Sequence, residues 1–412
     1  MDSVARRRLA GCVLAFVVGA SGGWFASRGS MFVTPDGGQY LAAAANIADG
    51  KGVTSPIVPE TTSTPIRDQL ATRGRMPFTE WPPGYPVAVA AVARLGFSTV
   101  DAARIVGAAS SGVIAALLLL LVHLLTASFG AGTLVVALVF FGPVVAGPTP
   151  LQSVPFLMQP LFVLSEPLFL AAVLAATLLA AASERGRAVA TATVVAIASA
   201  ALIRYVGVAV GTACGVAAVG VLAADGAPGR WRRAAVYAVT GPVAIVVWSV
   251  GRRLPWGAGP TKLIGWHPPS GRRFGQIFDV AAAWFGAPQS VSGVIRVVAV
   301  LVIWVGVTAV TLVPAARRTL VGDTFDAPAP RFALLVCVVW MWVYPLTVAG
   351  ASVVVDANVP FDQRVLGPAA VGVWVALVAL VWVGARRRVP ASFHPGGPVL
   401  AGCLCVALVP LT

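Results

Sequence analysis

Five ionisable residues lie beside long apolar segments of the chain: Asp36, Arg104, Glu166, Arg204 and Arg364. Charged groups are costly next to a membrane interior, and their presence there suggests function. Guanidinium groups bind anions such as phosphate, and a facing carboxylate can take a proton from an attacking hydroxyl. These residue types indicate an anion site that faces a carboxylate.

Asp36 lies in the segment "TPDGGQYLAAAANIADGKG", just after the first apolar run. Two interpretations are open. With Gln39 three residues later, Asp36 is typical of a capping box that starts a helix through Ile47, which Asp49-Gly50 would end. Alternatively, the Asp36 carboxylate is a chemical group, and the helix holds it at the membrane boundary.

The other ionisable residues also have structural alternatives. Glu166 or Ser165 in "VLSEPLFL" could cap a helix. Arg204 in "ALIRYVGVAV" separates two apolar runs and belongs in a tight turn, where an arginine could simply extend toward the interface. Arg104 follows a potential cap, and Arg364 opens an apolar segment in "NVPFDQRVLGP".

The elements that must position these residues are membrane helices. Of 412 residues, 58% are hydrophobic and 11% are charged, whereas soluble domains have about 25% charged residues. Apolar stretches of roughly 16 to 25 residues recur, as helices crossing a bilayer require. We therefore expect an all-α polytopic helical bundle forming one domain, 1–412.

Composition also bears on partners. The net charge is +14, but aromatic-rich basic motifs for nucleic acid are absent from the sequence. The five cysteines lie in apolar runs, which predicts neither disulfides nor a metal site. Metal dependence is left open.

Eleven spans are predicted, and arginine distribution orients them. The segments are 9–26, 102–127, 131–148, 164–183, 188–203, 205–223, 234–251, 294–316, 332–350, 365–385 and 397–412. Alternate connections then contain 14 of the 29 basic residues, at positions 6–8, 185, 187, 230, 232, 233, 317, 318, 331 and 386–388. By the positive-inside rule these connections are cytoplasmic, as is the N-terminus, and we expect a multi-pass plasma-membrane protein.

Two long outer loops follow from this topology. Residues 27–101 form the first, with helices along the surface at 37–48 and 84–96; counting 82–96 as a span would reverse every later connection. Residues 252–293 form the second loop, whose basic residues include Lys262. His267 lies there beside tryptophans that either belong to an interfacial belt or stack on sugar rings.

Six motifs occur in order: "DGGQY", "WPPGYP", "AAR", "SEPLF", "IRYVG" and "DQRVLGP". Together they resemble the C-type membrane glycosyltransferases, the polytopic enzymes that include protein O-mannosyltransferases and the lipid A aminoarabinose transferase. The resemblance covers most of the chain and implies transfer of a hexose or pentose from a polyprenyl-phosphate carrier to an acceptor hydroxyl at the outer membrane face, with inversion. The acceptor would be an envelope glycan, lipid or protein.

The resemblance also implies residue roles. Asp36 corresponds to the general base. Candidate ligands of the carrier phosphate are Arg104, Arg204 and Arg364, with Lys262 in reserve. Expected substrate contacts are Tyr40, Glu80, Trp81, Tyr85, Glu166 and His267.

The sequence departs from the family pattern at two places. Gly37 stands where many relatives have a second acid, so a further carboxylate would come from Glu80 or Glu166, or be unnecessary. Trp81 stands where the aminoarabinose branch has a lysine. This difference weakens the inference that this chain uses the same acceptor as that branch.

Two other classes of function compete. A transporter or flippase of a lipid-linked or polar solute would place polar residues near the bilayer midplane within repeated halves, a pattern not found here. The second competing class is a catalytically inactive relative that organises cell-wall enzymes. The presence of Asp36 argues against this class.

Overall fold

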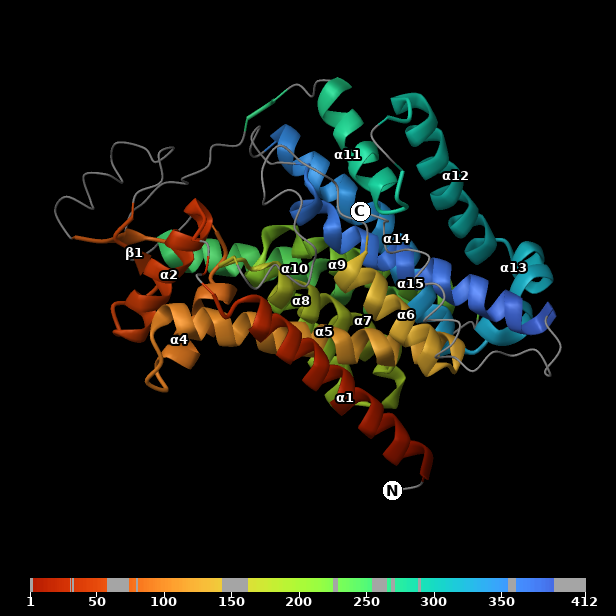
Figure 1. The fold of residues 1–412 in the computed structure, drawn as a ribbon, viewed down its shortest axis with the longest axis horizontal. Helices are drawn as coiled ribbons and strands as arrows, with labels where there is room; N and C mark the ends of the chain where they lie inside the picture. The colour runs from red at the N-terminus through yellow and green to blue at the C-terminus, as the bar shows by residue number, and fades with distance from the viewer. Residues whose placement is uncertain are drawn as a thin grey trace.

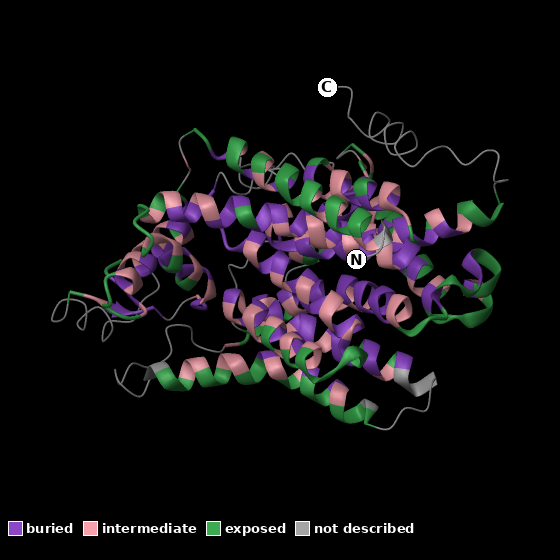
Figure 2. Cartoon of the chain, turned by 90° about the horizontal axis from the view of Figure 1, so that it is seen from below, coloured by how far each residue is buried: buried purple, intermediate pink, exposed green. Residues whose placement is uncertain are grey.

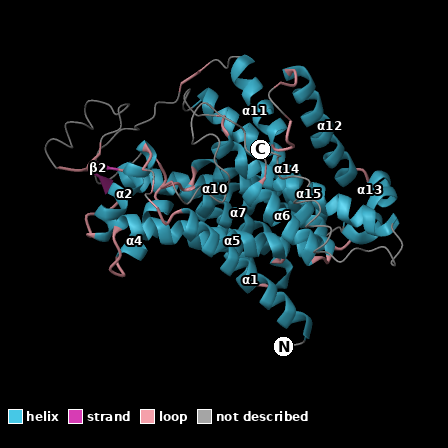
Figure 3. Cartoon of the chain, in the orientation of Figure 1, coloured by secondary structure: helices cyan, strands magenta, loops and turns pink. Residues whose placement is uncertain are grey.

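The structure is a computed structural model that describes residues 3–29, 31, 33–57, 74–78, 81–142, 162–224, 229–253, 265–267, 271–287, 290–354 and 361–388. The described chain is almost entirely helical, as Figure 3 shows. One two-stranded antiparallel pair joins β1 (Thr54–Ser55) to β2 (Met76–Pro77), with Thr54 opposite Pro77. The expected all-α polytopic fold is confirmed.

Six described helices are long and apolar enough to cross a membrane. They are α1 (Ser3–Ala26), α5 (Thr99–Thr126), α10 (Arg230–Arg253), α12 (Gly293–Leu312), α14 (Pro328–Val354) and α15 (Gln363–Arg388). Four shorter apolar helices coincide with further predicted spans: α6 (Phe129–Phe141), α7 (Glu166–Ala181), α8 (Arg187–Ile203) and α9 (Val208–Ala224). At 1.5 Å per residue these are shorter than a hydrocarbon core of about 30 Å. The count of eleven spans is not confirmed, and segment 397–412 lies outside the described residues.

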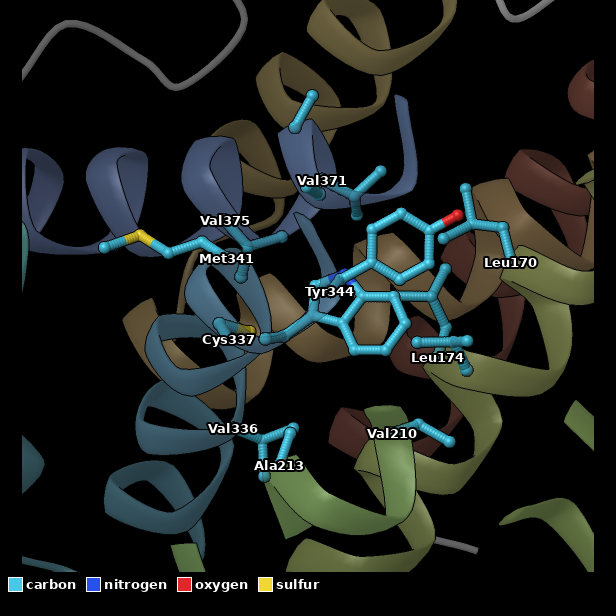
Figure 4. Packing of buried hydrophobic residues seen from close by; sticks show 14 of the residues in the cluster. Leu170, Leu174, Val210, Ala213, Val336, Cys337, Met341, Tyr344, Val371 and Val375 are labelled. Atoms are coloured by element: carbon cyan, nitrogen blue, oxygen red, sulfur yellow. The ribbon is translucent and has the colours of Figure 1, made fainter. Parts of the chain in front are cut away.

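The centre of the bundle is formed by α5, α7, α9, α14 and α15. Figure 4 shows Leu170 and Leu174 of α7 beside Tyr344 of α14, with Val371 of α15 on the other side. Buried residues are concentrated in these central helices, whereas many valine and leucine side chains of α1, α10 and α12 are exposed. Figure 2 shows buried residues (purple) mainly in the middle of the molecule and exposed residues (green) on the helices at its edges. Outward apolar side chains are what a lipid environment requires, because lipid rather than water surrounds the bundle.

The first long loop folds against one end of the bundle, which we call the site end. It contains α2 (Pro35–Ala48) and α4 (Gly84–Ala93), close to the predicted 37–48 and 84–96. The two helices pack on each other, and both lie at the left in Figure 1. A Cβ on Gly84 would come within 2.7 Å of the Leu202 carbonyl oxygen. Only glycine therefore lets α4 pack this closely against the end of α8, directly before Arg204.

The second long loop contains the helix α11 (Gly271–Ala283). Interfacial helices were expected in both long outer loops, but no residue range was predicted for this one. It leads into α12, and Figure 1 shows both along the upper edge of the molecule, outside the central helices. A short helix, α13 (Pro314–Val321), and a 3-10 turn then lead to α14.

The arginine groups predicted in inner connections lie at the opposite end of the bundle. Helix α15 starts at the site end and finishes with Arg386, Arg387 and Arg388. Arg387 donates a hydrogen bond to the Arg318 carbonyl oxygen (3.0 Å), and Arg233 pairs with Glu184 in the turn after α7. The helices thus separate these basic groups from the five residues singled out above.

Candidate active site

The first turn of α2 presents Asp36 to the rest of the protein. Thr34 is the N-cap, and its hydroxyl accepts a hydrogen bond from the Gly37 amide at 3.0 Å. The Gln39 side chain accepts instead from Ser55 at 3.1 Å. The capping-box interpretation is therefore wrong. Because Thr34 caps the helix, the Asp36 carboxylate is available for another partner, which is Arg364: Oδ2 lies 3.5 Å from Nη1.

Gly37 is required where it stands. A Cβ there would come within 2.9 Å of both the Val163 side chain and its carbonyl oxygen. Val163 lies two residues before Ser165, so this contact seats α2 against the start of α7. A second acidic side chain directly after Asp36 would not fit, and the closest described carboxylate across Arg364 is Glu166.

Glu166 is the first residue of α7 and is fully buried. Its Oε1 lies 2.6 Å from Arg204 Nη1 and 3.6 Å from Arg364 Nε. The preceding Ser165 makes no capping hydrogen bond; its hydroxyl accepts one from Arg204 at 3.4 Å and lies 3.5 Å from the Tyr40 hydroxyl. The polar side chains at the start of α7 face arginines rather than cap the helix.

Arg204 lies in the turn between α8 and α9, as predicted. Its backbone is extended (φ −144°, ψ 134°), which ends α8 and lets a 3-10 turn, Tyr205–Gly207, lead into α9. This turn projects the guanidinium between the start of α7 and the first loop. Arg204 and Arg364 thus come from different parts of the chain and share one buried carboxylate.

The start of α15 fixes Arg364. The Asp362 carboxylate accepts a hydrogen bond from the Val365 amide at 2.8 Å and caps the helix. The hydroxyl of Tyr344, on α14, donates to the Val365 carbonyl oxygen at 2.8 Å. Burial raises the pKa of the Asp362 carboxyl, although the adjacent Arg364 acts in the opposite direction. Sequence reasoning missed Tyr344; its place in a long apolar helix, "VVWMWVYPLTV", gave no signal.

Exposure of the charged side chains decreases inward. The Asp36 side chain is 36% exposed, those of Arg204 and Arg364 are 18% and 16%, and that of Glu166 is 2%. The charged side chains thus range from the partly exposed Asp36, through the two mostly buried arginines, to Glu166, which lies deepest and balances both cations.

Aromatic residues of the first loop pack beside Asp36. The Tyr40 ring is 5.2 Å from that of Tyr85 and 6.0 Å from that of Trp81, both edge-on, and Phe78 stacks on Trp81. Tyr40 and Tyr85 are buried, and burial raises the pKa of each phenol. Trp81 is half-buried and is therefore the most exposed of these three predicted substrate contacts.

Other predicted residues lie elsewhere. Arg104 is bound to Asp101 (2.6 Å) and donates to the Ser27 carbonyl oxygen (2.9 Å), and no contact with Arg204 or Arg364 is found among the described residues. The His267 backbone amide donates to the Val353 carbonyl oxygen near the end of α14. Glu80 and Lys262 lie outside the described residues. Within the described ranges, no group of three or more His, Cys, Asp or Glu that could hold a metal ion is found.

No protein-family model matches the sequence, and no curated protein matches it. Among solved structures, the chain is similar to a crystal structure of ArnT from Cupriavidus metallidurans bound to undecaprenyl phosphate. The identity is 17% and the TM-score 0.48; the match covers 96% of this chain and 63% of that chain. This chain thus spans less than two thirds of that protein.

Replacing Gly37 by alanine should displace α2 from Val163 and lower activity, because the added methyl group has no room. The matched control is Gly38→Ala, whose added Cβ would meet only Val33 Cγ1, at 3.8 Å. We expect a loss of thermal stability of about 1–3 kcal/mol for Gly37→Ala and little change for Gly38→Ala. Equal melting temperatures and activities for the two variants would contradict the close contact.

The variant Glu166→Gln should be strongly destabilised, because it leaves two largely buried guanidinium groups without their shared counter-charge. Removing one partner of a buried ion pair costs about 3–5 kcal/mol. The control is Glu184→Gln, which removes an exposed carboxylate paired with Arg233 at the other end of the bundle and should cost about 0–1 kcal/mol. Thermal unfolding in detergent measures both; a stable Glu166→Gln protein would show that Glu166 does not organise the site.

Proposed function

We propose that this protein is a membrane glycosyltransferase that moves a sugar from a polyprenyl-phosphate carrier to an acceptor hydroxyl, with Asp36 as general base. The supporting observation is the arrangement of charges: two partly exposed arginines share a buried carboxylate, and a more exposed carboxylate lies 3.5 Å from one of them. This arrangement suits an anion site with a proton acceptor beside it.

The arginines suit the phosphate of the carrier. Guanidinium groups bind phosphate oxygens through paired, charge-assisted hydrogen bonds. Arg204 and Arg364 are mostly but not completely buried, and the shared carboxylate of Glu166 offsets the cost of removing two cations from water. Arg104 pairs with Asp101, and no ion pair joins it to Glu166 or Asp36 within the described ranges, so the proposed phosphate site consists of Arg204 and Arg364.

The reaction follows from these positions. The acceptor oxygen attacks the anomeric carbon of the sugar, the bond between that carbon and the phosphate oxygen breaks with its electron pair going to the phosphate, and configuration inverts. Asp36 takes the proton of the acceptor hydroxyl. The charge that develops on the leaving phosphate is stabilised by Arg204 and Arg364, the kind of electrostatic contribution that is often the largest in catalysis.

The contact between Arg364 and Asp36 has a role in this scheme. The distance of 3.5 Å between Arg364 Nη1 and Asp36 Oδ2 is long for a charge-assisted hydrogen bond. A carrier phosphate competes for the same guanidinium and leaves the Asp36 oxygens free to accept a proton. Donor binding would then activate the base, which favours an order in which the lipid-linked sugar binds before the acceptor.

We place the site at the outer face of the plasma membrane. The basic groups at residues 185, 187, 233, 318 and 386–388 lie at the end of the bundle away from Asp36, and the positive-inside rule assigns that end to the cytoplasm. The acceptor, an envelope glycan, lipid or protein, would approach across the two long loops, where the half-buried Trp81 is a candidate contact for a sugar ring. Mannose and arabinose are the first sugars to test.

The test of the base uses purified protein in nanodiscs with a panel of polyprenyl-phosphate hexoses and pentoses. Asp36→Asn should lower kcat by about 10²- to 10⁴-fold, the usual contribution of a positioned base. The control is Asp49→Asn, at the other end of the same helix, where the carboxylate is exposed and pairs with Lys51; it should retain activity. No donor consumed by the wild type would refute the transferase, whereas an active Asp36→Asn would refute only the base.

Donor affinity tests the phosphate site separately. Arg364→Ala should weaken binding of undecaprenyl phosphate by about 10- to 100-fold, because hydrogen bonds to charged groups contribute about 1.5–3 kcal/mol. Arg104→Ala, which removes an arginine held by Asp101 and Ser27, should leave that affinity nearly unchanged. If Arg104→Ala weakened the binding and Arg364→Ala did not, the phosphate site would have to be assigned to Arg104 instead.

A further inference from the structure

The second long loop contacts the residues that flank Arg364. Arg273 of α11 lies over the ring of Phe361, 5.6 Å from its centroid. Trp284, directly after α11, donates its indole N–H to the Gln363 side-chain oxygen at 2.9 Å. Phe361 and Trp284 are both buried. A loop far away in the sequence thus holds the two residues on either side of the Asp362 cap.

Helix α11 is itself anchored on α12. Asp279 pairs with Arg296 at 3.3 Å, and the ring of Trp284 stacks on that of Trp304, with centroids 6.5 Å apart and planes at 18°. Trp304 in turn lies edge-on against Trp342 of α14, 5.0 Å away. The indole of Trp284 therefore cannot shift without disturbing a chain of packed rings.

Arg364 needs such support. Its two ion-pair contacts, to Asp36 at 3.5 Å and to Glu166 at 3.6 Å, are both long, and its Nε makes no hydrogen bond among the described residues. Contacts of this length do not fix a guanidinium by themselves. Its position depends on the orientation of the first turn of α15, and Gln363 is the adjacent residue in that turn.

We propose that Trp284 and Gln363 are positioning residues of the carrier-phosphate site. The indole N–H of Trp284 holds the Gln363 side chain and through it the first turn of α15, so that Arg364 stays between Asp36 and Glu166. The inference rests on the proposed function, since it concerns the affinity for the donor phosphate. It makes the second long loop part of the donor site even though the loop does not contact the phosphate.

The chain offers a matched pair of variants. Trp284→Phe keeps a stacked ring but removes the N–H that Gln363 accepts. Trp304→Phe alters the same pair of stacked rings, yet the Trp304 indole nitrogen has no hydrogen-bond partner in the described part of the chain. Gln363→Met removes the acceptor at nearly constant side-chain length. Aromatic packing alone predicts similar effects of the two tryptophan variants.

The first measurement is binding of undecaprenyl phosphate in nanodiscs, with donor KM beside it. Trp284→Phe and Gln363→Met should each weaken binding about two- to tenfold, the range for loss of one neutral hydrogen bond. The double variant should be no weaker than either single one, because both remove the same interaction. Acceptor KM should stay constant, and Trp304→Phe should bind like the wild type.

The second measurement does not depend on the ligand. Amide hydrogen exchange in residues 363–367 should accelerate in Trp284→Phe and not in Trp304→Phe. Wild-type donor affinity and unchanged exchange in Trp284→Phe would overturn the positioning role, and so would equal losses in both tryptophan variants. A wild type that fails to bind the polyprenyl phosphate while exchange still accelerates would instead refute the proposed function and leave the structural link standing.

Discussion

The buried carboxylate of Glu166 is the constraint on which the site depends. An ionised carboxylate out of contact with water costs several kcal/mol unless cations and hydrogen bonds compensate it. Arg204 and Arg364 supply the cations, and they come from the turn after α8 and the start of α15. The ends of three otherwise apolar elements must therefore meet at one point, although apolar packing alone would allow α7, α8 and α15 to slide along one another.

The first loop is attached to that point and completes it. Gly37 seats α2 against Val163, Thr34 caps the helix, and Tyr40 reaches Ser165. The result is a graded arrangement, in which a buried anion lies behind two partly exposed cations and a more exposed anion lies in front. Such a gradient suits the proposed reaction, in which a charged phosphate leaves on one side and a hydroxyl approaches on the other.

The helical fold and the gathering of polar groups at one end were predictable, because hydropathy and arginine distribution depend on short stretches of sequence. Asp36, Glu166, Arg204 and Arg364 were singled out in this way. The details that the sequence could not supply depend on contacts between distant segments. Gln39 follows Asp36 at capping-box spacing, yet Thr34 precedes both and Ser55 competes for Gln39. Arg104 shares the same end of the bundle but is held by Asp101. The sequence around Tyr344 and Trp284 indicates only that these residues lie among apolar neighbours. Their hydrogen bonds to the start of α15 could therefore not be anticipated.

The most direct test of this account is a structure of the protein in nanodiscs with a bound polyprenyl phosphate. The account predicts phosphate oxygens about 3 Å from the guanidinium groups of both Arg204 and Arg364, with Asp36 released from Arg364 and facing the open side of the site. A phosphate bound beside Arg104, or at the opposite end of the bundle beside Arg386–Arg388, would contradict it.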